Sequence, residues 1–248
     1  MTVARCRRVR PSRYFIRVKA SAIIVVRTRL PHASNQLFSN LLDNPLRFPF
    51  AARAIPLGDS KGSAQDDESS CLRKGGGRVI ACDLRNADVI ADLTTSAGRA
   101  ELVDRVTRLS GGRIDGIVAN AGGGAAETSL SLNFFGAVAT LEGLRPLLAT
   151  SPAPRAVAVS SIASFSPVDP GLVEACLSLD ERRAVAAARE FATKTAPLDA
   201  MSAAQGLKVG LDLYSNAKHA LNCWCRRAAV KPQWAGAGIP LNVVAARC

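Results

Sequence analysis

The sequence has few residues suited to binding a metal and no segment suited to crossing a membrane. It contains only two histidines, His32 and His219, and seven irregularly spaced cysteines. Cys223 and Cys225 lie two apart on an expected helix, so their side chains diverge. This spacing argues against zinc, and we expect no metal. No run approaches the roughly 20 apolar residues that span a bilayer, so we expect no membrane partner.

Acidic residues are absent from the first 30 positions, which hold nine basic ones. Residues 1–75 contain 14 of the 32 Lys and Arg but only 5 of the 20 Asp and Glu, and therefore most of the net charge of +12. Such a start is typical of a transit peptide or of a basic arm for RNA or membrane. A shifted reading frame or a wrong start is the third interpretation, and we favour it. We expect no nucleic-acid partner, because the rest of the chain is nearly balanced in charge. Unpaired cysteine spacing favours reduced thiols and a cytoplasmic location.

From Arg78 onward, short apolar runs alternate with helical patterns. The predicted strands are 78–83, 89–93, 116–120, 156–161 and 240–245, and the predicted helices are 96–110, 131–148, 167–210 and 211–229. Thr95 or Ser96 can cap the first helix, and Gly111 can end it. This alternation predicts a Rossmann-like, doubly wound parallel α/β sheet within a domain at 76–248. Ser21–Val26 has the composition of one more buried strand and could substitute for a missing one.

Polar or small residues stand at the ends of these strands, where parallel sheets bind ligands. A carboxylate at Asp83 can accept both hydroxyls of an adenosine ribose and would repel a 2′-phosphate, which favours NAD over NADP. Small residues after Asn120 let the backbone approach a flat ligand. A hydroxyl at Ser161 can bind a substrate carbonyl. Taken singly, each is also what an ordinary turn or helix cap contains.

Tyr214 and Lys218 are four positions apart on an expected helix and therefore share one of its faces. A free tyrosine titrates near pH 10, too high for a general base at neutral pH. A nearby cation favours the phenolate, lowers the pKa and makes proton transfer feasible near pH 7. An exposed i,i+4 pair with no chemistry is the alternative. The order of the pieces along the chain, each on the element that its chemistry needs, favours a site.

In this order the chain resembles the short-chain dehydrogenase/reductase family from about Arg78 to Ala245. The stretches 82–95 and 131–136 resemble most closely its bacterial hydroxysteroid dehydrogenase/carbonyl reductase subgroup. The long segment between Ser161 and Tyr214 fits as well, because this subgroup inserts dimer-contacting helices there. The resemblance implies an NAD(H)-dependent oxidoreductase that interconverts a small hydrophobic secondary alcohol and a ketone, of the hydroxysteroid or xenobiotic carbonyl type. It also implies a homodimer.

The resemblance implies roles for particular residues. Tyr214 would donate the proton, Lys218 would lower its pKa and bind the nicotinamide ribose, and Ser161 would orient the carbonyl. Asn133 would hold a water that links Lys218 to solvent. Tyr214 and Lys218 would also contact the cofactor. Asp83 and Leu84 would lie beside its adenosine, and Asp92 and Leu93 would line the adenine pocket. Asn120, Ala121 and Gly122 would pack along the cofactor.

The sequence departs from the family pattern at both ends. The family opens with a strand and a Thr-Gly-x-x-x-Gly-x-Gly turn whose amides hold a pyrophosphate. Gly75–Gly77 is no substitute, because these glycines lead into a strand. The Pro-Gly turn and final strand expected after Ala245 are not found either. We therefore expect a sheet that is incomplete at both ends. A non-catalytic, truncated remnant is the alternative function.

Overall fold

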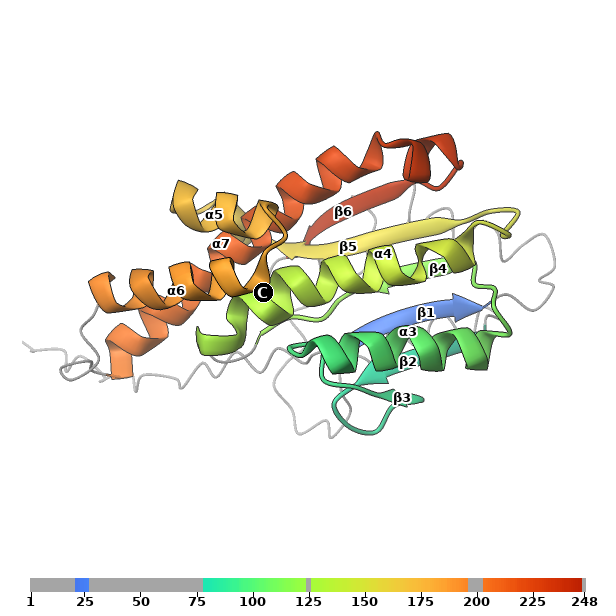
Figure 1. Cartoon of the computed structure of the whole chain (residues 1–248), viewed down its shortest axis with the longest axis horizontal. Helices are drawn as coiled ribbons and strands as arrows, with labels where there is room; N and C mark the ends of the chain where they lie inside the picture. The colour runs from blue at the N-terminus through green and yellow to red at the C-terminus, as the bar shows by residue number, and fades with distance from the viewer. Residues whose placement is uncertain (1–20, 27–77, 124–125, 196–202, 247–248) are drawn as a thin grey trace, which may run out of the picture.

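The computed structural model describes residues 21–26, 78–123, 126–195 and 203–246 (Figure 1). They form one six-stranded sheet in the order β3-β2-β1-β4-β5-β6. The strands are β1 (Ser21–Val26), β2 (Arg78–Asp83), β3 (Val89–Ile90), β4 (Gly116–Ala119), β5 (Arg155–Ser161) and β6 (Leu241–Ala246). The main helices are α3 (Ser96–Ser110), α4 (Ala137–Leu148), α5 (Pro170–Leu177), α6 (Glu181–Thr195) and α7 (Ala203–Ala229).

The predicted α/β alternation from Arg78 onward is confirmed, with strand limits close to those expected. Thr95 caps α3, and Gly111, at a positive φ of 69°, ends it. The helix predicted for 131–148 begins with a turn of π-helix, η4 (Ser131–Gly136), which continues into α4. The expected helical segment 167–210 contains α5, α6 and the first part of α7, and the predicted helix start at Leu211 is wrong because α7 begins at Ala203. Of the atypical segment 1–75, only β1 falls within the described residues.

The direction of β1 is the main difference from the expected parallel sheet. β1 lies between β2 and β4 and pairs antiparallel with both, so that Ala22 is opposite Cys82 on one side and Ala119 on the other. The other five strands run in one direction. Val26, at the end of β1, is opposite Arg78, the first residue of β2. The chain therefore leaves β1 at one end of the sheet, whereas β2 and β4 finish at the other end.

One face of the sheet carries the main hydrophobic core. Every second residue of the central strands contributes a small or branched side chain to this core, and α3, α4 and α7 pack on the same face. Alanines at 22, 119, 156 and 158 are almost completely buried there. Since alanine occupies little space, the helix backbones can approach the sheet closely. The opposite-facing residues Val79, Ala81 and Val157 are also buried but lie outside this core cluster. No helix in the described part of the chain is long and apolar enough to cross a membrane.

We predict that truncating Ile24 destabilises the whole domain. Ile24 is fully buried in the strand that joins the two halves of the sheet, so Ile24→Ala should lower the free energy of unfolding by about 2–5 kcal/mol. Ile90→Ala is the control, because Ile90 is 64% exposed on the outermost strand β3 and should change little. Urea denaturation followed by circular dichroism measures both, and equal effects would contradict a structural role for β1.

We predict that three core thiols stay protonated in the folded protein. Burial raises the pKa of Cys176 to about 12. Burial, together with the nearby Asp83 carboxylate, raises the pKa of Cys82 to about 12. Burial also raises the pKa of Cys225 to about 12, although the charge of Lys218 acts in the opposite direction. At pH 8, a thiol reagent should therefore modify the half-buried Cys223 before these three. Mass spectrometry of the labelled peptides checks this order.

The same shifts predict a loss of stability in alkali. Because these thiols titrate at higher pH when folded than when unfolded, their contribution is complete below pH 9 and is lost as pH rises from 9 toward 12. The melting temperature of Cys176→Ala should decline less steeply above pH 9 than that of the unsubstituted chain. Parallel declines would contradict the assignment.

Candidate functional site

The site lies at the carboxyl ends of β2, β4 and β5. These strands are parallel to one another, so Asp83, Asn120 and Ser161 lie at the same end of the sheet. α7 packs against β5 and η4 and brings its middle section over this end. The topology thus places side chains from four separate segments at the same end of the sheet.

Lys218 is the most deeply buried charged side chain of this region, at 2% exposure. Its Nζ donates to the carbonyl of Val159 at 2.8 Å and lies 3.5 Å from the carbonyl oxygen of Ala121. The ammonium group therefore bridges the ends of β4 and β5. It also lies 5.8 Å from the centroid of the Tyr214 ring, so that phenol and ammonium share one side of α7.

Ser161 is buried at the end of β5, and its hydroxyl caps the short helix η5 (Ile162–Phe165). Its Oγ accepts a hydrogen bond from the backbone N–H of Ala163 at 3.2 Å. This contact uses the oxygen as an acceptor, and the hydroxyl keeps its capacity to donate to a carbonyl. The helix-cap interpretation of Ser161 is thus confirmed, and it is compatible with a role toward substrate. The neighbouring Ser160 donates to the carbonyl of Lys218 at 3.4 Å.

Asn133 is fully buried in the π-helical turn η4, and both the nitrogen and the oxygen of its amide form hydrogen bonds within the protein. Nδ2 donates to the carbonyls of Gly123 and Ser129 at 2.9 and 2.8 Å, and Oδ1 accepts from the N–H of Gly123 at 3.0 Å. Asn133 therefore fixes the loop that follows β4. π-Turns are enriched at functional sites because they re-aim side chains out of the regular helix pattern.

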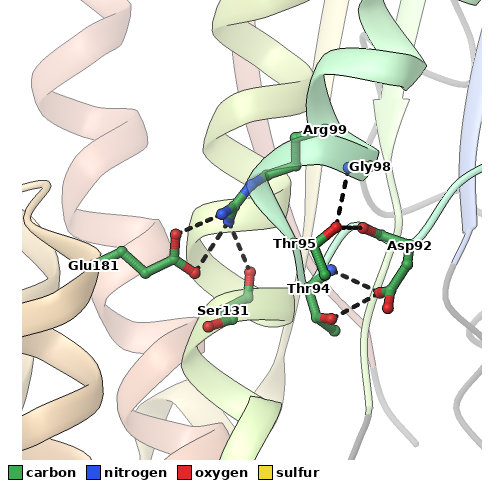
Figure 2. Close-up of polar contacts among 7 residues, drawn as sticks. All are labelled: Asp92, Thr94, Thr95, Gly98, Arg99, Ser131 and Glu181. Atoms are coloured by element: carbon green, nitrogen blue, oxygen red, sulfur yellow. Dashed lines mark hydrogen bonds and ion pairs between the residues drawn. The ribbon is translucent and has the colours of Figure 1, made fainter.

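Asp92 is exposed and organises the turn that enters α3, as Figure 2 shows. Its Oδ1 accepts from the N–H and the hydroxyl of Thr94 at 2.9 and 2.7 Å, while its carbonyl accepts from Thr95. Gly98 approaches so closely that an added Cβ would lie 2.0 Å from the carbonyl oxygen of Asp92. Leu93 is buried in the core, next to the carboxylate of this tight turn.

The remaining predicted cofactor residues are divided between the two halves of the sheet. Asp83 is half-buried at the end of β2, and Leu84 beside it is 48% exposed. Asn120 is half-buried, and Ala121 and Gly122 are buried, beyond the end of β4. β1 separates the two groups. Asn133, Ser161, Tyr214 and Lys218 all lie on the β4–β5 side, whereas Asp83, Leu84, Asp92 and Leu93 lie on the β2–β3 side.

Sequence reasoning missed an ion pair between Arg99 and Glu181, which Figure 2 also shows. The two Arg99 Nη atoms lie 3.2 and 2.5 Å from the two carboxylate oxygens of Glu181, and Nη1 lies 3.4 Å from the carbonyl of Ser131. Arg99 is only 8% exposed. One side chain thus joins α3, η4 and α6 beside the site. A separation of 82 positions leaves no local pattern from which the pair could have been inferred.

The described residues contain no group of three or more His, Cys, Asp or Glu side chains that could hold a metal ion. The cation at the site is instead Lys218, supplied by the protein itself. A ligand at the ends of β4 and β5 would lie near this ammonium and near the small residues Ala121 and Gly122, which suits a flat, hydroxyl-bearing group.

The chain resembles the short-chain dehydrogenase/reductase family in sequence and in fold. No protein-family model matches the chain. The 3-alpha-hydroxysteroid dehydrogenase/carbonyl reductase of Comamonas testosteroni is 33% identical over 178 residues, which are 70% of this chain and 64% of that protein.

A solved structure extends this likeness to three dimensions. The 3-alpha-hydroxysteroid dehydrogenase of Pseudomonas sp. B-0831, crystallised with NADH, is 33% identical and superimposes with a TM-score of 0.58. The matched part covers 73% of this chain and 66% of the other. The chain thus spans slightly less than two thirds of the length of both relatives. The predicted resemblance to this bacterial subgroup is confirmed.

We predict that the Arg99–Glu181 pair stabilises the helical insertion. Arg99→Met should lower the free energy of unfolding by about 2 kcal/mol, because it leaves a partly buried carboxylate and the Ser131 carbonyl without their donor. A double-mutant cycle with Glu181→Gln measures the coupling. The exposed pair of Lys208 and Asp212 is the control, and Lys208→Met should change stability by less than about 0.5 kcal/mol. Additive effects of the Arg99 and Glu181 substitutions would contradict the prediction.

Proposed function

We propose that this chain is an NAD(H)-dependent oxidoreductase that interconverts a secondary alcohol and a ketone on a small hydrophobic substrate. The observation that carries the proposal is the placement of Lys218. Its buried ammonium lies between the ends of β4 and β5, within 5.8 Å of the Tyr214 ring centroid. Burying the Lys218 ammonium costs desolvation energy. An exposed Tyr-Lys pair without a chemical role would leave this ammonium in water, so its burial favours a site.

In this proposal each polar residue handles a proton or a carbonyl. Tyr214 gives its phenolic proton to the carbonyl oxygen during reduction and removes it from the alcohol during oxidation. Lys218 favours the phenolate by its charge. Ser161 donates to the carbonyl oxygen and orients it. Asn133 holds the loop after β4 in place and takes part in the water link from Lys218 to solvent.

A bound nicotinamide would supply or accept the hydride. We propose NAD as the cofactor, because the half-buried carboxylate of Asp83 suits ribose hydroxyls and would repel a 2′-phosphate. Asp83 and Leu84 then lie on the adenosine side, Asp92 and Leu93 near the adenine, and Asn120, Ala121 and Gly122 along the cofactor. We propose substrates of the hydroxysteroid or xenobiotic carbonyl type, and the likeness to two hydroxysteroid dehydrogenases supports this.

Three further proposals go with this function. The oxidoreductase domain extends over residues 76–248, with a helical insertion at 167–210. A homodimer forms, as the inserted helices α5 and α6 favour by their likeness to the bacterial subgroup. The cytoplasm is the location, and the support for it is that the four described cysteines are free thiols.

A non-catalytic remnant is the second candidate, and the direction of β1 favours it. If β1 were parallel to its neighbours, the chain would leave it at the end of the sheet where the site lies, and there a following helix N-terminus can hold a pyrophosphate. Here the chain leaves β1 at the other end of the sheet, since Val26 is opposite Arg78. The described residues therefore present the two ends of a dinucleotide site without a pyrophosphate-binding turn between them.

We predict saturable binding of NADH to the purified chain, measured by the change in nicotinamide fluorescence. Asp83→Ala should weaken binding about tenfold, as expected for losing one charge-assisted contact with a ribose. Tyr214→Phe should still bind NADH but should reduce ketones at least about a hundredfold more slowly, because its general acid is gone. Lys208→Met, on the exposed part of α7, should resemble the unsubstituted chain in both assays.

Two outcomes would overturn the proposal. A folded sample that binds no NADH would establish the remnant as the better description. Ketone reduction that survives Tyr214→Phe would remove Tyr214 from the chemistry. Circular dichroism melting of every variant distinguishes a lost contact from a lost fold.

A further inference from the structure

Arg99 connects three segments of the chain beside the candidate site, as Figure 2 shows. Its Nη1 and Nη2 atoms lie 3.2 and 2.5 Å from the two carboxylate oxygens of Glu181, at the start of α6. Nη1 also donates to the carbonyl of Ser131 at 3.4 Å. A guanidinium group can serve two acceptors at once, because its N–H donors form a rigid planar fork. Since Glu181 holds both Nη atoms, it fixes the plane of this fork and keeps one donor facing Ser131.

The apolar packing of α6 relies on small or partly exposed side chains. Its two buried residues are alanines, Ala184 and Ala188, and Phe191 beside them is only partly buried. Alanine side chains bury a small apolar area, so they stabilise the docked helix little. The Arg99 and Glu181 side chains are 10% and 29% exposed, and a pair so shielded from water is screened less by salt than a surface pair. The ion pair therefore gives α6 and α3 a defined position beside η4.

The acceptor at Ser131 begins η4, and η4 fixes the loop after β4. All six residues of η4 are buried. Asn133 donates to the carbonyl of Gly123 at 2.9 Å and accepts from its N–H at 3.0 Å. Gly123 has a positive φ of 101°, a conformation that suits glycine, and these two hydrogen bonds hold it. We call residues 120–123 the β4 loop, and Arg99 reaches this loop through Ser131 and Asn133.

Close packing holds the other end of η4. A Cβ added at Gly136, the last residue of η4, would lie 3.1 Å from the carbonyl oxygen of Leu93 and 3.3 Å from its Cβ. Leu93 belongs to the turn that leads into α3, and the backbone N–H of Arg99 donates to the carbonyl of Thr95 in the same turn at 3.1 Å. This turn and the start of α3 therefore fix η4 at both ends, at Gly136 by contact and at Ser131 by the guanidinium.

The β4 loop in turn contacts Lys218. The carbonyl oxygen of Ala121 lies 3.5 Å from Nζ of Lys218. Lys218 has a second and shorter contact on β5, because Nζ donates to the carbonyl of Val159 at 2.8 Å. Loosening η4 would therefore free the β4 loop while Lys218 stays attached to β5. The loop depends on Arg99, whereas the ammonium is held by β5 as well.

We propose that Arg99, oriented by Glu181, is a positioning residue for cofactor binding. It holds the start of η4, so that Asn133 keeps the β4 loop in the conformation that packs along a nicotinamide cofactor. The proposal rests on the proposed function, in which the β4 loop lies along NADH. Arg99 acts through Asn133, whereas the proton-transfer groups Tyr214 and Ser161 are carried by α7 and β5. Loss of Arg99 therefore weakens cofactor binding and leaves the rate of the bound complex nearly unchanged.

The first test measures hydrogen exchange of the Gly123 amide by nuclear magnetic resonance, on the full chain without cofactor. In Arg99→Met this amide should exchange at least about tenfold faster, because its acceptor Asn133 is no longer held in place. Leu148→Ala is the matched control. Leu148 is fully buried at the end of α4 farthest from η4, so its truncation destabilises the domain and leaves η4 intact. Exchange at Gly123 should then change less than about twofold.

The second test measures NADH affinity and ketone reduction on the same variants. Arg99→Met should raise both the Kd and the KM for NADH about tenfold, while kcat stays within about twofold. Glu181→Gln, which keeps the shape of the side chain and one acceptor, should give a smaller rise of about threefold. Arg105→Met is the second control, because Arg105 belongs to an exposed pair with Glu101 at 3.8 Å and should change neither constant.

Three outcomes would overturn the proposal. They are equal acceleration at Gly123 in Arg99→Met and Leu148→Ala, unchanged NADH affinity in folded Arg99→Met, or a lower kcat at unchanged KM, which a merely structural role predicts. If Arg99→Met does not fold, Glu181→Gln decides in its place. An unsubstituted chain that binds no NADH would contradict the proposed function instead, and exchange at Gly123 would still decide whether Arg99 holds the β4 loop.

Discussion

Backbone pairing on both sides of β1 holds the two halves of the sheet together. β1 pairs with β2 along all six of its residues and with β4 along four. Without it, the β2–β3 half that carries Asp83 would connect to the β4–β5–β6 half mainly through the packing of α3 on α4. The geometry of the whole site depends on this short apolar strand, because β1 sets the spacing between the two halves of the sheet.

The predicted site residues lie on both sides of β1, and β1 itself is where the sheet departs from the expected parallel arrangement. Reversing a strand preserves the alternation of its side chains, so Ala22 and Ile24 can fill the core in either direction. Reversal does change the edge at which the connecting chain leaves the sheet. The core therefore tolerates the antiparallel arrangement, whereas a ligand site that uses the segment after the central strand is sensitive to it.

Local patterns were sufficient to predict most elements and part of the site. Thr95 and Gly111 were predictable limits of α3, because capping depends on neighbours within a few residues. The shared face of Tyr214 and Lys218 followed from the helix period.

Other features depend on partners far away in the sequence. The direction of β1 is set by its neighbours and not by its own six residues. The Arg99–Glu181 pair joins segments 82 positions apart. None of these contacts has a signature within a short window of sequence, and each requires the folded chain to be seen.

The π-helical turn η4 makes the length of one segment as important as its composition. Each residue of a regular helix turns the chain by about 100°, so removing one of the three residues between Asn133 and α4 would rotate Asn133 relative to α4. Its amide could then no longer reach Gly123 and Ser129 together. Substitutions that keep six residues in this turn preserve the geometry, whereas a one-residue deletion shifts the phase of everything before it. Homologous chains should therefore vary in sequence here before they vary in length.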